Sequence, residues 1–331
     1  MVQTAYKHTI LLGRGRVGCY NWSLPEVYSM KKRLAAVGAA ALYLCSCSGA
    51  PTAPAPVPSE NVAPTPRSFG ASEARLVGAG DIATCGSPGS ELTALLLDAM
   101  NGTVFTTGDN VYPNGSFEQF RDCYEPSWGR HRDRTRPTAG NHDYEMPNAA
   151  AYYNYFGSNA GPAGRGYYSY SAGEWHVVTL NSEIDVRAGS PQEQWLRMDL
   201  LSNPTSCTAV IWHRPRYSSG PNGDNKDMQD IWRTIQEFNA DIVLAGHDHL
   251  YERFAPQDVN GRVDFDRGIR QFVIGTGGRT VSAMRAARAN SEIIGGDLGV
   301  LSLTLLPNSY RWEFVPVVGA TFRDSGTGLC H

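Results

Sequence analysis

Five short apolar runs, rich in β-branched residues, each lead into a polar cluster, mostly through a small residue. The clusters begin at Asp81, Asp109, Asn141, His213 and His247. Apolar runs of this length are typical of buried strands. Helical patterns at 91–100, 192–201 and 227–238 lie between them. This alternation predicts an α/β fold, in which a sheet gathers the polar residues at one edge, beyond the carboxyl ends of its strands.

Other segments complete the expected fold. Residues 176–182 and 270–278 have the apolar pattern of further strands, and 300–318 has the pattern of a closing strand pair. The region 144–175 is rich in tyrosine and glycine and is expected to be a long aromatic loop. This loop either forms a wall of the site, where its tyrosines stack on a leaving group, or packs on itself at the surface.

The polar clusters carry the donor atoms of a metal site. Carboxylates suit hard cations, and imidazoles suit zinc, iron and manganese. Calcium sites use oxygen ligands only, and structural zinc sites favour cysteine, so the mixture fits neither. Tyr112 in GDNVY is the unusual member, because a phenol ionises only near pH ~10. It either binds a cation of high charge or packs in the turn VYPNG.

The order GD, GDxxY, GNHD, an isolated histidine and GHxH resembles the five blocks of the metallophosphoesterase (calcineurin-like) superfamily. Tyr112 makes the chain similar to the purple acid phosphatases within it, over roughly residues 75–250. The resemblance implies an α/β/β/α sandwich of two mixed sheets with flanking helices. It also implies two metal ions bridged by Asp109. The implied ligands of one ion are Asp81, Tyr112 and His249, and those of the other are Asn141, His213 and His247.

The resemblance further implies Fe(III) at the Tyr112 site beside Fe, Zn or Mn. The implied activity is hydrolysis of phosphate monoesters by metal-bound hydroxide, with His142 assisting the leaving group and Asp143 orienting His142. Asp248 lies between two ligands, and we interpret it as structural. Two alternatives remain open at this point: a phosphodiesterase or nucleotide hydrolase of the same superfamily, and a metal-containing binding protein without turnover.

The match departs from the family pattern in two places. The first block reads Asp81-Ile82-Ala83 instead of Asp-x-Gly. No histidine occurs between 214 and 246, where family members often carry one or two that contact the substrate. Asn222 is the candidate for that place, as a hydrogen-bond donor to substrate that does not transfer a proton. Further candidate phosphate contacts are Arg214, Arg216 and Tyr217.

The first seventy-two residues have the composition of a targeting region. A basic cluster at 31–33 precedes an apolar run at 34–44, which is typical of an export signal. That run is shorter than the ~20 residues a membrane span needs. LCSC at 44–47 resembles a bacterial lipobox, which implies cleavage before Cys47 and its acylation. We interpret Met30 as the translation start, with 1–29 a mis-assigned extension; a genuine disordered extension is the alternative.

These features divide the chain into a signal at 30–47, a Pro/Ala-rich tether at 48–72 and a catalytic domain at 73–331. We expect a lipoprotein anchored on the periplasmic or cell-surface side. Four cysteines remain after processing, an even number in an oxidising compartment. Of the three possible pairings we favour Cys85–Cys123 and Cys207–Cys330, since the latter would fix the C-terminus; free buried thiols are the alternative. The net charge of −3 gives no sign of an electrostatic surface for nucleic acid. The resemblance implies a small phosphate ester as the partner.

Overall fold

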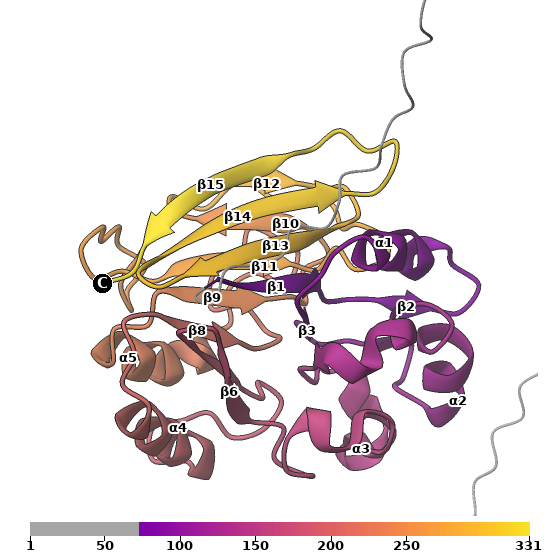
Figure 1. The fold of residues 1–331 in the computed structure, drawn as a ribbon, viewed down its shortest axis with the longest axis horizontal. Coiled ribbons are helices and arrows are strands. Elements are labelled where there is room, and N and C mark those ends of the chain that lie inside the picture. The colour runs from indigo at the N-terminus through magenta and orange to yellow at the C-terminus, as the bar shows by residue number, and fades with distance from the viewer. Residues whose placement is uncertain (1–72) are drawn as a thin grey trace, which may run out of the picture. The chain divides into compact units, whose positions relative to one another are not determined.

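A computed structural model of the chain describes residues 73–331 (Figure 1). The predicted extension at 1–29, the signal with Cys47, and the tether at 48–72 lie outside the described residues. Within 73–331, no helix combines the length and the apolar character needed to cross a membrane.

The first of two large sheets is mixed and has six strands in the order β15-β14-β13-β1-β3-β5. β1, β3 and β5 are parallel, whereas β13, β14 and β15 are joined in antiparallel fashion and attach to β1 through β13. The strands are β1 (Ala74–Ala79), β3 (Thr103–Thr106), β5 (Thr135–Arg136), β13 (Gly299–Leu306), β14 (Ser309–Pro316) and β15 (Asp324–Leu329).

The second large sheet is also mixed and has seven strands in the order β12-β10-β11-β9-β8-β7-β6. Its centre, from β11 to β7, is parallel, and antiparallel strands flank it on both sides. The strands are β6 (Tyr168–Ala172), β7 (Trp175–Thr179), β8 (Thr208–Ile211), β9 (Ile242–Ala245), β10 (Tyr251–Phe254), β11 (Arg270–Ile274) and β12 (Ser291–Gly295). A separate small pair joins β2 (Ala83–Thr84) and β4 (Val111–Tyr112).

The helices are short, and two of them cover the second sheet. α4 and α5 contact each other and lie side by side in Figure 1. The α-helices are α1 (Gly89–Asp98), α2 (Phe117–Gln119), α3 (Ala150–Phe156), α4 (Pro191–Ser202) and α5 (Gln229–Glu237). The remaining turns are a π-helix at Phe120–Tyr124 and 3-10 segments at Trp128–Arg134, Asp143–Glu145, Pro147–Ala149, Gly157–Ala160 and Lys226–Met228.

Alternate side chains of the central strands belong to two hydrophobic cores. In β8, Ala209 and Ile211 lie in the core shared with the first sheet, whereas Val210 lies in the core shared with α4 and α5. β9 repeats the pattern, with Leu244 in the first core and Val243 in the second. Because both faces are buried, these strands are apolar at every position, which is why the sequence shows runs rather than alternation.

Several expectations are confirmed and one is wrong. The α/β architecture of two mixed sheets is present, and the helices at 91–100, 192–201 and 227–238 correspond to α1, α4 and α5. The region 144–175 is not a continuous loop, since it contains α3 and β6. Its glycines suggested a loop, but its tyrosines and phenylalanine bury enough apolar surface to order it.

Both predicted cysteine pairs are present. Cys85–Cys123 joins the segment after β2 to the π-helix, and Cys207–Cys330 joins the start of β8 to the C-terminus. The second bridge closes a loop of 123 residues. A cross-link over so long a loop restricts the unfolded chain strongly, which stabilises the folded state.

Candidate metal centre

The predicted ligands gather where the two sheets end together. Asp81, Asp109 and Asn141 follow β1, β3 and β5 of the first sheet. The histidines at 213, 247 and 249 follow β8 and β9 of the second sheet. The expectation of a single sheet edge is therefore wrong. The two parallel centres pack face to face across the first core, so both sets of carboxyl ends open at one place.

The carboxylate of Asp109 lies at the middle of this group and is 1% exposed. Its Oδ2 is 3.0 Å from the hydroxyl of Tyr112, and its Oδ1 is 3.3 Å from Nε2 of His213. The backbone amide of His142 donates to the same Oδ1 at 2.8 Å. One side chain thus faces two separate groups of donor atoms.

The first donor group contains the phenol. The Tyr112 hydroxyl is 2.8 Å from Oδ1 of Asp81 and 3.3 Å from Nε2 of His249. That imidazole nitrogen is 3.4 Å from the same Asp81 oxygen. With Oδ2 of Asp109, these atoms form a compact set of three oxygens and one nitrogen.

The second donor group is built around His213. Its Nε2 is 3.1 Å from the amide oxygen of Asn141 and 3.2 Å from Nδ1 of His247. Donor atoms of Asp109, His213 and His247 all lie within 4.8 Å of one another. All seven predicted ligands therefore meet at one place. The group that includes His213 has four members, the group that includes Tyr112 also has four, and Asp109 belongs to both.

Backbone carbonyls orient two of the imidazoles. Nδ1 of His213 is 2.8 Å from the carbonyl of Thr107, and Nδ1 of His249 is 3.0 Å from the carbonyl of Thr280. A carbonyl only accepts, so these contacts place a proton on Nδ1 of each ring and turn Nε2 toward the interior of the cluster. Imidazole nitrogens that face inward beside two carboxylates can take up either a proton or a cation, and the donor set fits two metal ions.

The backbone at three of these residues is strained. Asp81, Asp109 and His247 have φ angles of 59°, 50° and 69°, in the left-handed region that side chains usually avoid. Such conformations cost free energy and persist only where the surroundings impose them. A glycine at position 140 leaves room for the Asp109 carboxylate. A Cβ on Gly140 would clash with Oδ1 of Asp109, at a distance of 2.3 Å.

Electrostatics within the cluster are strongly coupled. Burial alone would raise the pKa of Asp109, but the nearby His213 outweighs it, and the pKa is lowered. Burial would lower the pKa of His213, but the charge and hydrogen bond of Asp109 raise it to about 10. Burial and His213 lower the pKa of His247 to about 3. The metal-free cluster thus holds a proton where a cation would lie.

Tyr112 keeps its proton in this environment. Burial and the charges of Asp81 and Asp109 raise the pKa of its phenol well above the ordinary value. The turn interpretation is wrong in one respect, since the hydroxyl does point into the cluster and contacts three predicted ligands. Only a cation of high charge would compensate the loss of the phenol proton at neutral pH.

Asp143 does not orient His142, contrary to expectation. The buried carboxylate of Asp143 accepts from the amide nitrogen of Gly140 at 2.8 Å and from Nδ2 of Asn110 at 2.9 Å. It therefore fixes the loops that carry Asp109 and Asn141. Burial and the charge of Asp109 raise its pKa to about 7. His142 is oriented instead by the carbonyl of Pro113, 2.5 Å from its Nδ1.

Asn222 and Arg214, two of the candidate substrate contacts, both lie beside His247. Nδ2 of Asn222 donates to the main-chain carbonyl of His247 at 3.1 Å, so its amide supports a predicted ligand. Asp248 is buried and accepts from Ser218 Oγ and from the backbone amide of Asn222, as a structural residue does. The guanidinium of Arg214 lies 3.3 Å from Nε2 of His247 and pairs with Glu183.

Two further candidates lie in the interior. Tyr217 belongs to the second core, and its hydroxyl donates to the carbonyl of Val259 at 2.9 Å. The Arg216 guanidinium stacks on the Tyr217 ring at 4.4 Å. Of the three candidates at 214–217, only Arg214 contacts a predicted ligand.

The aromatic region mostly packs on itself and on the core. The hydroxyl of Tyr152 donates to the carbonyl of Pro137, and the Tyr155 ring stacks on Phe120 at 4.9 Å. The hydroxyls of Tyr144 and Tyr153 are 3.4 Å apart. These contacts favour the alternative in which the region packs on itself rather than on a leaving group.

Sequence reasoning missed Thr107, Thr280 and Arg279. The two threonines act through main-chain carbonyls, for which side-chain identity gives no signal. Arg279 contacts the ring of Tyr112, with its guanidinium carbon 4.7 Å from the ring centroid. The run GTGGR at 275–279 resembles the other strand–glycine–polar segments, and that pattern was the available signal.

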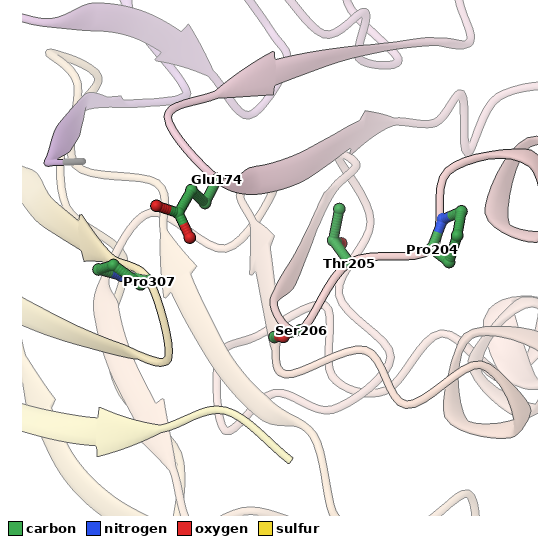
Figure 2. Close-up of a pocket in the computed structure, with 5 residues that line it drawn as sticks. All are labelled: Glu174, Pro204, Thr205, Ser206 and Pro307. Carbon is green, nitrogen blue, oxygen red and sulfur yellow. The ribbon is translucent and has the colours of Figure 1, made fainter. Parts of the chain in front are cut away.

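A surface pocket of about 420 Å³ lies elsewhere on the molecule (Figure 2). Its lining residues are Glu174, Pro204, Thr205, Ser206 and Pro307. They belong to the turns that precede β7, β8 and β14, at the amino ends of those strands. The pocket therefore opens away from the carboxyl-end cluster, and Glu174 is its only ionisable side chain.

The chain spans less than half the length of two curated relatives that it matches. An uncharacterized protein of Mycobacterium tuberculosis is 27% identical over 237 residues, covering 57% of this chain and 45% of the relative. Purple acid phosphatase 22 of Arabidopsis thaliana is 34% identical over 119 residues, covering 34% of this chain and 27% of the relative.

Solved structures share the fold at low sequence identity. Purple acid phosphatase PPD1 from yellow lupin seeds superposes with a TM-score of 0.64 at 21% identity, covering 78% of this chain and 54% of that chain. GAP50, the anchor in the inner membrane complex of Plasmodium, superposes with a TM-score of 0.61 at 14% identity, covering 78% and 89%. The family model for calcineurin-like phosphoesterases matches residues 76–251, more than half of the chain. The chain therefore belongs to the calcineurin-like phosphoesterase family.

Proposed function

We propose that this protein hydrolyses phosphate monoesters at a binuclear metal centre. The supporting observation is the position of Asp109, whose two carboxylate oxygens face the two donor groups separately. In this proposal Asp81, Tyr112 and His249 hold one ion. Asn141, His213 and His247 hold the other, and Asp109 bridges them. The purple acid phosphatases among the relatives and the structural neighbours support the same assignment.

The bound ions would supply an activated water and would neutralise charge that develops on the phosphate. We propose Fe(III) beside Tyr112 with Fe, Zn or Mn in the second position. The support is chemical: a buried phenol with a raised pKa gives up its proton most readily to a trivalent ion. Asn141 is a neutral ligand, which leaves the second ion with less charge compensation than a third carboxylate would.

His142 would act on the leaving oxygen. Its Nδ1 is occupied by the Pro113 carbonyl, and its Nε2 lies 3.9 Å from Oδ2 of Asp109. The side chain is 33% exposed, so substrate can reach the free nitrogen. A proton held at Nε2 can pass to the departing alkoxide, which is ordinary general-acid catalysis. Arg214 and Asn222 are at the other side of the site, near His247.

Two assays on metal-replete protein test the proposal. We expect p-nitrophenyl phosphate to be hydrolysed with a higher kcat/KM than its bis-ester. We expect His142→Ala to lower kcat about 10²–10⁴-fold on an alkyl phosphate, whose leaving group needs a proton. A preference for the bis-ester would indicate a phosphodiesterase. No turnover on any phosphate ester would indicate a binding protein, an outcome that a relative named as a probable inactive purple acid phosphatase makes worth measuring.

We also propose that the catalytic domain is exported and held at a membrane by lipid on Cys47. The basic and apolar segments at 31–44 and the LCSC sequence support this proposal. The two disulfides support an oxidising compartment.

A further inference from the structure

Of the side chains that contact the ring of Tyr112, two lie nearest to it. The imidazole of His142 lies 4.4 Å from it between centroids, and the guanidinium of Arg279 lies 4.7 Å from its centroid. The phenol itself is 1% exposed. Tyr112 is thus enclosed, and one of the groups that enclose it carries a permanent positive charge.

Arg279 is attached to the Tyr112 side of the site at two further points. Its Nη1 donates to Oγ1 of Thr84 at 3.1 Å, and its backbone amide donates to the carbonyl of Asp81 at 2.8 Å. Thr84 is the register partner of Tyr112 in the β2–β4 pair. The guanidinium is therefore held by the strand next to Tyr112, and its place over the ring does not depend on a metal ion.

The charge of Arg279 is not matched by a carboxylate. Among the ion pairs of residues 73–331 none includes Arg279, whereas Arg214 on the opposite side pairs with Glu183 at 2.9 Å. The electron-rich face of the Tyr112 ring is the contact that this cation makes instead. A cation over an aromatic face attracts the π electrons of the ring, and partial burial strengthens the attraction.

We propose that Arg279 is a positioning residue for Tyr112 that lowers the energy of the ring electrons when the phenolate is bound to metal. This inference rests on the proposed function, which places Tyr112 on a trivalent ion. A phenolate bound to Fe(III) absorbs visible light by transferring an electron from ring to metal. A neighbouring cation holds that electron more firmly, so the transition requires light of shorter wavelength.

The visible spectrum of the metal-replete protein tests this role independently of activity. We expect Arg279→Met to move the absorption maximum to longer wavelength by on the order of 10 nm or more, as a cation–π contact of ordinary strength would require. Arg279→Gln keeps a hydrogen-bond donor for Thr84 but no charge, and should shift in the same way. Arg279→Lys keeps the charge and should restore most of the wild-type wavelength.

Arg132 offers a matched control. Its guanidinium lies 5.3 Å from the centroid of the Tyr155 ring, in the same kind of contact outside the metal cluster. Arg132→Met should leave the spectrum unchanged. If Arg279→Gln binds metal and keeps the wild-type wavelength, the inference is overturned. A wild-type protein with bound metal and no visible band would instead overturn the tyrosine ligand of the proposed function.

Discussion

Asp109 and His213 form a buried ion pair at the centre of the cluster, with Oδ1 of Asp109 3.3 Å from Nε2 of His213. The side chains are 2% and 0% exposed. Burial shields the pair from solvent, so the proton on His213 compensates the carboxylate in the metal-free protein. The proton and the proposed metal ion therefore compete for the same nitrogen.

Metal affinity should rise with pH. The pKa of His213 is raised to about 10, so below that pH the metal-free site carries a proton that binding must expel. The raised pKa of His213 stabilises the folded, metal-free protein. This stabilisation is complete below pH ~6.5, the pKa of histidine in the unfolded chain, and is lost as pH rises through about 10. The apparent affinity should increase roughly tenfold per pH unit for each proton released. Calorimetry at pH 6, 7 and 8 measures the metal affinity. An affinity that stays constant over this range would show that metal binding expels no proton from His213.

Asp109→Asn should disturb both metal positions, whereas Asn141→Ala should disturb one. The amide keeps the shape of the carboxylate but removes the charge that the two donor groups share. Activity should fall by more than the roughly 10–100-fold typical of residues that only support a ligand. Metal analysis of the folded variants gives the stoichiometry. Full occupancy of both positions in Asp109→Asn would exclude a bridging role.

Tyr112→Phe should abolish the visible band and weaken binding of one ion. The substitution removes one oxygen and keeps the buried ring with its Arg279 contact, so the fold should be retained. Absorption spectra and metal content measure the effect, with circular dichroism as the check on folding. A variant that stays coloured would remove Tyr112 from the ligand set.

Asp143→Asn should destabilise the protein by about 1–3 kcal/mol, the usual cost of an unsatisfied buried group. The carboxylate accepts bonds from Gly140 and Asn110, and an amide nitrogen would face one of these donors. Asp133→Asn is the control, because Asp133 is exposed. Urea unfolding of both variants measures the difference. Equal stability of the two would mean that Asp143 does not fix the Asp109 loop.

Cys47→Ser should release the protein from the membrane fraction while leaving catalysis unchanged, since residue 47 precedes the catalytic domain. Cell fractionation followed by a phosphatase assay on the soluble and membrane fractions measures the change. Cys45→Ser is the matched control and should remain in the membrane fraction. Retention of Cys47→Ser in that fraction would remove the lipobox interpretation.

The ends of the strands were predictable because an apolar run followed by a small residue and a polar residue is visible in the sequence. Asp81 and Asp109 each follow a glycine after an apolar run, and the left-handed φ angles of both residues belong to that turn. The strand-end pattern marked most of the donor residues, the resemblance to the metallophosphoesterase superfamily implied the full set of seven, and the structure brings all seven together. Cys207 and Cys330 were paired because a bridge between them would fix the C-terminus, and the structure contains this bridge.

The role of Asp143 was not predictable in the same way. Its position next to His142 suggested a direct contact, but its carboxylate reaches back to Asn110 and Gly140. Arg279 was also missed, since nothing near residue 279 indicates a tyrosine 167 positions earlier. Both depend on contacts between segments that are distant in the chain.

The sequence alone determined which residues carry donor atoms and which runs are buried on both faces, because donor chemistry and hydrophobic periodicity are local properties. Tertiary structure decided that the donors come from two sheets instead of one, and that Asp109 faces both halves of the cluster. It also decided which groups surround the ligands. Packing of one sheet against another fixes these relations, and no local pattern records the angle or depth of that packing.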